Sequence, residues 1–191
     1  MNEAQWIESA RRGDEGAWTE LVHIHQEPVF RLAYLMLGDP DEAADAAQET
    51  FIRASRALHR FDLSRPLRPW LFQIVANLAR NRRRSIGRYW AALQRGFQKD
   101  LPAHLDVESR AGARLQAQRL WQAVRRLREE DQQMIYLRYF LDLPVQEAAQ
   151  AAGVAEGTVK SRTSRAMSRL REVIQREFPD LEMEQKDDRI Y

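Results

Sequence analysis

The sequence predicts an all-α protein in which a flexible linker joins two small helical modules. Apolar residues recur with the helical period through most of the chain, and no stretch alternates as a strand does. The period weakens between about residues 87 and 112, where glycines, a proline and mixed charges occur. We therefore divide the 191 residues into a first module, a linker, a second module and an acidic tail, at residues 1–88, 89–112, 113–176 and 177–191.

The first two helices are predicted from their capping residues. Asn2 precedes a short amphipathic stretch that Gly13 ends, and Asp14 precedes a longer one that Gly38 ends. Pro28 lies inside the longer stretch, where it is expected to bend or split the helix. The module therefore begins with two helices on either side of a tight break.

Two further helices complete the first module. Asp39 followed by Pro40 is a strong N-terminal signal, and the third helix is expected to run to about Phe61. Two prolines between residues 62 and 69 predict a loop, and the fourth helix is expected over residues 70–84.

The second module contains a helix-turn-helix pattern. A helix over residues 130–141 is followed by a short helix, a turn at Gly153 and a longer helix. At 100° per residue, one face of this last helix is apolar and consists of Val159, Ala166, Leu170 and Val173. The other face is polar and consists of Lys160, Ser161, Ser164, Arg165, Ser168 and Arg171. An ordinary solvated helix also has a polar face, but such faces usually pair arginine with glutamate, and this one alternates it with serine.

The charge distribution predicts two partners of opposite charge. The net charge is only +2, but residues 1–52 carry 3 basic and 11 acidic side chains, and residues 53–90 carry 10 arginines and one aspartate. No cysteine is present, which excludes disulfides and thiolate chemistry and fits a reducing cytoplasm. No apolar run approaches the roughly 18 residues of a membrane span, and no signal peptide is evident. We expect a cytoplasmic protein without membrane insertion.

A family resemblance rests first on the last helix. The run Gly157-Thr158-Val159-Lys160-Ser161-Arg162, followed by Ser164-Arg165-Ala166, resembles the end of domain 4 in sigma factors of the extracytoplasmic-function (ECF) class of the sigma-70 family. There this helix reads the −35 promoter element. The resemblance implies a −35 DNA-binding set of Thr158, Lys160, Ser161, Arg162, Ser164 and Arg165, with Arg162 on phosphate.

The helix-turn-helix departs from the family pattern at its core. Thr163 stands where the family usually has Leu or Ile, and alanines replace bulkier aliphatics at positions 148, 151 and 152. We expect a thinly packed core, with most buried area from Met134, Leu137, Phe140, Leu143 and Val154.

The first module carries a matching signature. Asp45-Ala46-Ala47-Gln48-Glu49-Thr50-Phe51 resembles domain 2 of the same family, which binds the clamp helices of the RNA polymerase β′ subunit. The polar face of this helix is acidic, and it complements a basic partner. The resemblance implies a core polymerase-binding set of Asp41, Asp45, Gln48 and Glu49, to which Glu42 adds charge.

A third motif points to single-stranded DNA. Trp70-Leu71, Ile74 and Asn77 resemble the segment that opens the −10 element and holds an extruded base. Such a base needs an aromatic wall, polar groups for its edges and cations for the backbone. The −10 DNA-binding set is Phe61, Ser64, Arg68, Asn77, Arg80, Arg83 and Arg84, and Arg82 is a further phosphate contact. Trp70 itself is expected in the core.

The sequence thus predicts a transcription initiation factor without a cofactor or covalent chemistry. Its implied partners are RNA polymerase core, through the β′ clamp helices and the β flap, promoter DNA and an anti-sigma factor. The main alternative is a dimeric helix-turn-helix regulator that binds a palindrome without polymerase. A metal-dependent hydrolase would have to use Asp41, Asp45 and Glu49, and the four histidines form no site.

Overall fold

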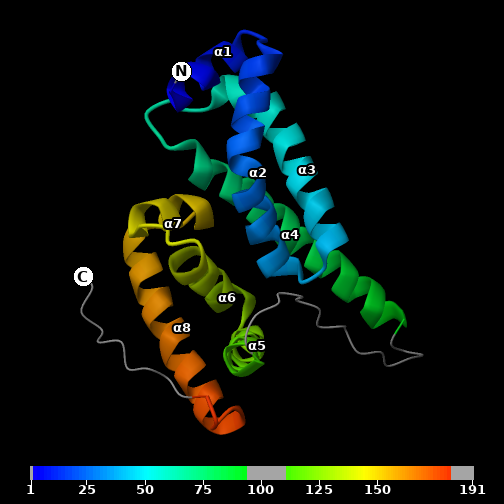
Figure 1. The fold of residues 1–191 in the computed structure, drawn as a ribbon, viewed down its shortest axis with the longest axis vertical. Helices are drawn as coiled ribbons and strands as arrows, with labels where there is room; N and C mark the ends of the chain where they lie inside the picture. The colour runs from blue at the N-terminus through cyan, green and yellow to red at the C-terminus, as the bar shows by residue number, and fades with distance from the viewer. Residues whose placement is uncertain (1, 94–110, 182–191) are drawn as a thin grey trace.

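The computed structural model describes residues 2–93 and 111–181, and all regular structure in these two stretches is helical (Figure 1). The first module contains α1 (Glu3–Arg11), α2 (Glu15–Leu37), α3 (Pro40–Ala57), the 3-10 turn η1 (Leu58–Arg60) and α4 (Leu67–Leu93). The second contains α5 (Ala111–Arg125), α6 (Glu129–Ile135), the π-helical turn η2 (Tyr136–Phe140), α7 (Val145–Ala152) and α8 (Glu156–Glu177). The all-α prediction is confirmed, while residues 94–110 of the expected linker and 182–191 of the expected tail lie outside the described residues.

The predicted helix caps of the first module are present. The side chain of Asn2 accepts a hydrogen bond from Gln5 N at 2.9 Å, and that of Asp14 accepts one from Ala17 N at 3.1 Å. Each such cap contributes about 1 kcal/mol to the free energy of unfolding. Gly38 ends α2 with φ at +78°, a conformation that favours glycine. Pro28 does not split α2, which continues through it as one helix.

The predicted boundaries of α3 and α4 are less accurate than the predicted helix caps. α3 ends at Ala57 and η1 carries the helical turn on to Arg60. α4 begins at Leu67 instead of residue 70, because Pro69 lies in its first turn, where a missing N–H group leaves no helical hydrogen bond unmade. α4 also continues past residue 84 to Leu93, and so extends into the first residues of the expected linker.

The core of the first module lies between α2, α3 and α4. The largest side chains in it are almost fully buried: Leu21, Val29, Leu32, Leu67, Leu71, Phe72 and Val75. α3 contributes small residues, and Ala43, Ala46 and Ala54 have no exposed surface. These alanines let α3 pack close to its neighbours, which leaves its polar face outward.

The core of the second module is fuller than expected. Met134, Leu137 and Leu143 are buried as predicted, whereas Phe140 and Val154 are only half-buried. Tyr136, which the sequence analysis missed, is 1% exposed and stacks on Trp121 of α5 at a centroid distance of 5.6 Å. Burial raises the pKa of Tyr136 to about 12. These aromatic rings add to the apolar core of the second module.

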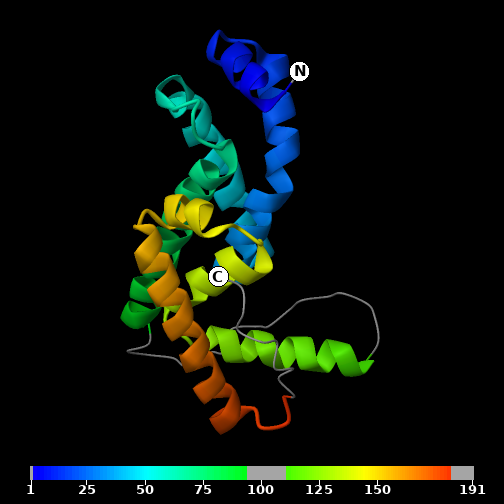
Figure 2. The ribbon, with the colours of Figure 1, turned by 90° about the vertical axis from the view of Figure 1, so that its left-hand side faces the viewer.

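The two modules pack against one another. α7 lies against α4 in both views (Figures 1 and 2), and the buried apolar side chains of the two modules form one continuous cluster. The turn between α7 and α8 therefore lies beside the start of α4.

Candidate nucleic-acid interface

α8 has an apolar face and a polar face, as its sequence predicts. Val159, Ala166 and Leu170 are buried, and the fourth buried residue is Ile174 rather than the predicted Val173. On the other side the structure exposes Lys160, Ser161, Ser164 and Arg165. This face therefore presents amino, guanidinium and hydroxyl groups of the kinds that contact phosphates and major-groove base edges.

The remaining −35 candidates are less accessible. Thr158 and Arg162 are half-buried, and Arg162 Nη2 lies 4.0 Å from Glu130 Oε2 at the start of α6. Arg165 Nε donates to Ser161 O at 3.2 Å, which holds that side chain along the helix. The structure thus brings all six candidates onto the first half of α8, with four of them facing solvent.

The turn before α8 depends on Gly153. Its φ is +68°, in the left-handed region, and it ends α7 by donating its N–H to Gln150 O at 3.2 Å. A side chain here would also meet Gln73 of α4, whose Nε2 lies 3.2 Å from the position of an ideal Cβ.

The −10 candidates begin in the loop before α4. Phe61 is buried, and its ring lies 4.9 Å from that of Trp70, so these two rings pack on one another. Asp62 Oδ1 accepts hydrogen bonds from Ser64 N at 3.0 Å and Ser64 Oγ at 2.7 Å. These bonds lower the pKa of Asp62 and keep Ser64 in the exposed loop.

The candidates along α4 fall into two groups. Asn77 and Arg84 are exposed, and Arg80 donates to the side-chain oxygen of Asn77. Arg68 and Arg83 instead reach the second module. Arg68 Nη2 donates to Leu141 O at 3.3 Å, and Arg83 Nη1 donates to Gln132 Oε1 at 3.3 Å.

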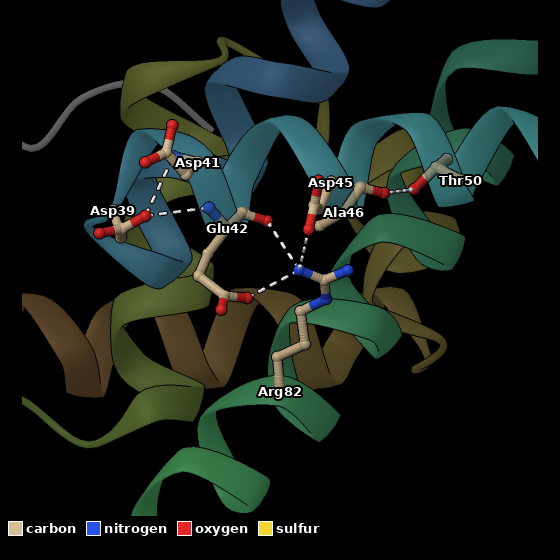
Figure 3. A network of polar contacts seen from close by, with 7 residues as sticks. All are labelled: Asp39, Asp41, Glu42, Asp45, Ala46, Thr50 and Arg82. Carbon is tan, nitrogen blue, oxygen red and sulfur yellow. Dashed lines mark hydrogen bonds and ion pairs between the residues drawn. The ribbon is translucent and has the colours of Figure 1, made fainter.

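The acidic face of α3 is tied to α4 by one arginine (Figure 3). Asp39 Oδ1 caps the helix by accepting from Asp41 N and Glu42 N. Arg82 Nη1 donates to Glu42 Oε2 at 2.7 Å and lies 3.6 Å from Asp45 Oδ2. In this conformation Arg82 therefore pairs with α3 instead of joining the exposed arginines of α4.

The other polymerase-binding candidates lie on the same side of α3. Asp41 and Gln48 are exposed, and Glu49 Oε1 accepts from Arg53 Nε at 2.7 Å. Beside them lies an apolar groove of about 670 Å³ that the sequence analysis missed, lined among others by Trp18, Val22, Phe30, Ala47, Phe51 and Ile52. Two of its lining residues, Phe30 and Ile52, are 36% and 38% exposed.

Other kinds of site are not found in the described ranges. Among residues 2–93 and 111–181, no three histidine, aspartate or glutamate side chains gather as metal ligands do. No described helix combines the length and apolarity that crossing a bilayer requires.

Comparison with known proteins gives the same pattern of two modules. The family model for Sigma-70 region 2 matches residues 21–89, and that for Sigma-70, region 4 matches residues 117–170. The ECF RNA polymerase sigma factor SigW of Bacillus subtilis (strain 168) is 28% identical to this chain, and the alignment covers 92% of this chain and 96% of SigW. The RNA polymerase sigma factor NccH of Alcaligenes xylosoxydans xylosoxydans is 31% identical to this chain, and the alignment covers 87% of this chain and 91% of NccH.

A solved structure shares the fold. The sigma factor RpoE from Bartonella quintana, in complex with the anti-sigma factor NepR, superposes with a TM-score of 0.67 at 24% identity, covering 83% of this chain and 97% of that one. Both family models match in the order of the two modules, and a relative above 30% identity aligns over most of both chains. The chain therefore belongs to the ECF class of the sigma-70 family of RNA polymerase sigma factors.

Proposed function

We propose that this sigma factor directs core RNA polymerase to promoters by using α8 on the −35 element and α4 with its preceding loop on the −10 element. The observation that carries the proposal is the exposed face of α8, where Lys160, Ser161, Ser164 and Arg165 stand side by side after a helix-turn-helix turn. No carboxylate of the described residues forms an ion pair with Lys160 or Arg165, so both are available for DNA.

At the −35 element, α8 enters the major groove with its N-terminal half. Arg165 has the length and planar donor geometry to read a guanine edge, and Lys160 and Arg162 contact phosphates. Ser161 and Ser164 add hydrogen bonds to base edges or to phosphates.

At the −10 element, the first module separates the two DNA strands and holds one of them. Phe61 and Trp70 form one side of the base pocket, and Ser64 and Asn77 supply polar groups for base edges. Arg80 and Arg84 contact the backbone. Opening costs about a few kcal/mol for each flipped base, and binding free energy from the other contacts offsets it. The proposal requires no covalent step and no cofactor.

The acidic face of α3 docks on polymerase. Asp41, Asp45, Gln48 and Glu49 face the β′ clamp helices, whose basic side chains they complement, and the second module reaches the β flap. An anti-sigma factor that covers these faces would hold the protein inactive in the cytoplasm.

The test is transcription in vitro with core polymerase on a promoter library. The wild-type chain is expected to start RNA chains at a defined set of sites, and the double variant Lys160→Ala/Arg165→Ala to lose that selection. Arg176→Ala removes an exposed arginine from the far end of the same helix and is the matched control. Failure of the wild-type chain to direct initiation at any site would refute the proposal.

A gel shift separates the alternative regulator. A dimeric regulator binds a palindromic duplex tightly without polymerase, whereas a sigma factor binds specifically only together with core enzyme. Tight, specific binding by the free chain would favour the regulator.

A further inference from the structure

The loop between η1 and α4 contains a tight turn that its own side chains hold in shape. Arg65 N donates to Asp62 O at 3.1 Å, which closes a four-residue turn. Aspartate is favoured at the first position of such a turn, because its side chain accepts hydrogen bonds from the backbone two residues on. Asp62 does this through Oδ1, which accepts from Ser64 N at 3.0 Å. One carboxylate therefore fixes the loop that precedes α4.

The same carboxylate determines the direction in which the hydroxyl group of Ser64 donates. Ser64 Oγ lies 2.7 Å from Asp62 Oδ1, and an ionised carboxylate can only accept. The hydrogen bonds from Ser64 lower the pKa of Asp62, so the group is ionised at neutral pH. The single proton of the Ser64 hydroxyl is therefore used inside the turn, and the oxygen presents only lone pairs to a ligand.

The second oxygen of the Asp62 carboxylate also has a partner. Arg65 Nε lies 3.4 Å from Asp62 Oδ2. The two side chains are 65% and 55% exposed, so this ion pair adds little to stability. It nevertheless favours the orientation in which Oδ1 faces Ser64. Residues of the turn thus fix the polarity of the Ser64 hydroxyl before DNA is bound.

The tip of the turn also carries an exposed apolar side chain. Leu63 is 37% exposed, although it is a large hydrophobic residue, and Ser64 beside it is exposed as well. An unstacked base needs an apolar contact for its face and a polar contact for its edge. Leu63 and Ser64 offer one of each from adjacent positions of the turn.

The four bases differ in the group that they would present to an acceptor. Adenine and cytosine carry an amino group at C6 and C4, where guanine and thymine carry a carbonyl oxygen. An amino group can donate to Ser64 Oγ. A carbonyl oxygen would instead face lone pairs, and both acceptors would then be unsatisfied. The fixed hydroxyl is therefore expected to distinguish amino bases from keto bases.

We propose that Ser64 accepts a hydrogen bond from the amino group of one unpaired adenine or cytosine of the −10 strand, and that Asp62 is the positioning residue that makes this serine an acceptor. Leu63 contacts the face of the same base. The inference rests on the proposed function, because it requires that the loop before α4 holds an unpaired base. It adds the chemical class of that base, and one hydrogen bond gained or lost corresponds to a discrimination of about tenfold.

The first experiment measures the lifetime of the complex of the full chain, core polymerase and promoter DNA with a pre-opened −10 region, in which base pairing plays no part. Each unpaired position carries in turn adenine, purine or hypoxanthine, which place an amino group, a hydrogen or a carbonyl oxygen at C6. Cytosine and uracil form the corresponding pyrimidine pair. At one position the amino base is expected to give about a tenfold longer lifetime than the keto base. The absence of any such position would overturn the inference.

The second experiment removes the acceptor. Ser64→Ala is expected to reduce the ratio of amino to keto lifetimes at that position from about tenfold to about one, and to leave the other positions unchanged. Ser9→Ala removes a hydroxyl group from α1 and is the matched control, which is expected to keep the ratio. A ratio that survives in Ser64→Ala would show that another group reads the base, and it would refute the role of the serine.

The third experiment separates positioning from a structural role of the aspartate. In Asp62→Ala the hydroxyl group of Ser64 is free to rotate and to donate to a carbonyl oxygen, so the lifetime with the keto base is expected to rise toward that with the amino base. A structural role would shorten the lifetimes with every base. A keto lifetime that does not rise would therefore refute the positioning role. If the wild-type chain forms no complex on any promoter, the proposed function fails; if it initiates transcription without preferring an amino base, only this inference fails.

Discussion

Arg169 Nη1 lies 2.5 Å from Asp131 Oδ2, and this ion pair joins the middle of α8 to the start of α6. The aspartate side chain is only 6% exposed, whereas that of the arginine is 39% exposed. Among the described ion pairs the carboxylate has Arg169 as its partner, and the pair helps to fix the position of α8 on α6.

Removal of this partner is expected to destabilise the second module. Arg169→Ala leaves the carboxylate of Asp131 buried without a cation, and because the arginine is partly exposed we expect a loss of about 1–3 kcal/mol. Urea unfolding of the full chain measures it. Arg176→Ala, on the same helix but exposed, is expected to change the stability little. Equal effects of the two substitutions would contradict this role for the pair.

Arg165→Ala tests readout of the −35 element. If the guanidinium reads a base, the variant loses about 1–3 kcal/mol of discrimination at one position of the element. Promoter variants that differ at single −35 positions measure the effect with polymerase present. An equal loss on every sequence would instead make Arg165 a phosphate contact.

Asn77→Ala tests the base pocket. The side chain is exposed on α4 and accepts a hydrogen bond from Arg80, so its loss is not expected to unfold the module. The variant is expected to form the closed complex normally and to open it poorly, as measured by permanganate reactivity of unpaired thymines. Unchanged opening would remove Asn77 from the pocket.

Thr163→Val is expected to stabilise the protein. The hydroxyl of Thr163 is buried without a hydrogen-bond partner among the described residues, and such a group costs about 1–3 kcal/mol. Valine has nearly the same shape, so we expect a gain of about 1 kcal/mol in the free energy of unfolding. Thr19→Val is the control, because the exposed hydroxyl of Thr19 donates to Glu15 O at 2.8 Å. A loss of stability at Thr163 would contradict the argument.

The attachment of α1 is expected to depend on pH. His25 Nε2 lies 2.8 Å from Glu3 Oε1, and this hydrogen bond lowers the pKa of Glu3 below its usual 4.5. Because the pKa of Glu3 is lowered in the folded state, its contribution to stability is fully present above the unfolded-state pKa and is lost as the pH falls through the folded-state pKa. The stability difference between wild type and Glu3→Gln should therefore stay constant near neutral pH and shrink as the pH falls below the usual glutamate pKa of 4.5. Glu8→Gln, at an exposed position, should show no such trend.

Local signals explain what the sequence predicts well. Asn2, Asp14 and Asp39 cap their helices, and Gly38 and Gly153 end theirs, because each effect needs only residues within one turn. The polar face of α8 follows from the helical period in the same way. The predicted start of α4 was wrong because a proline was expected to lie before the helix. Pro69 lies instead in its first turn, where proline is tolerated.

Contacts between distant segments leave no local signal. Arg68 and Arg83 were expected to bind −10 DNA, and only the fold shows Leu141 and Gln132 within hydrogen-bonding distance of them. Likewise, Tyr136 lies in a π-helical turn that shifts the helical register, so a period of 3.6 residues does not place it in the core.

The bridge from Arg82 to α3 determines which substitutions isolate polymerase binding. A change at Glu42 or Asp45 also removes a partner of the Arg82 guanidinium, and hence affects α4, the helix that carries the −10 candidates. Asp41 and Gln48 make no side-chain contact with Arg82 in the described residues. Under the proposed function, alanine variants at Asp41 and Gln48 are therefore expected to impair docking alone, whereas variants at Glu42 and Asp45 are expected to impair docking and strand separation together.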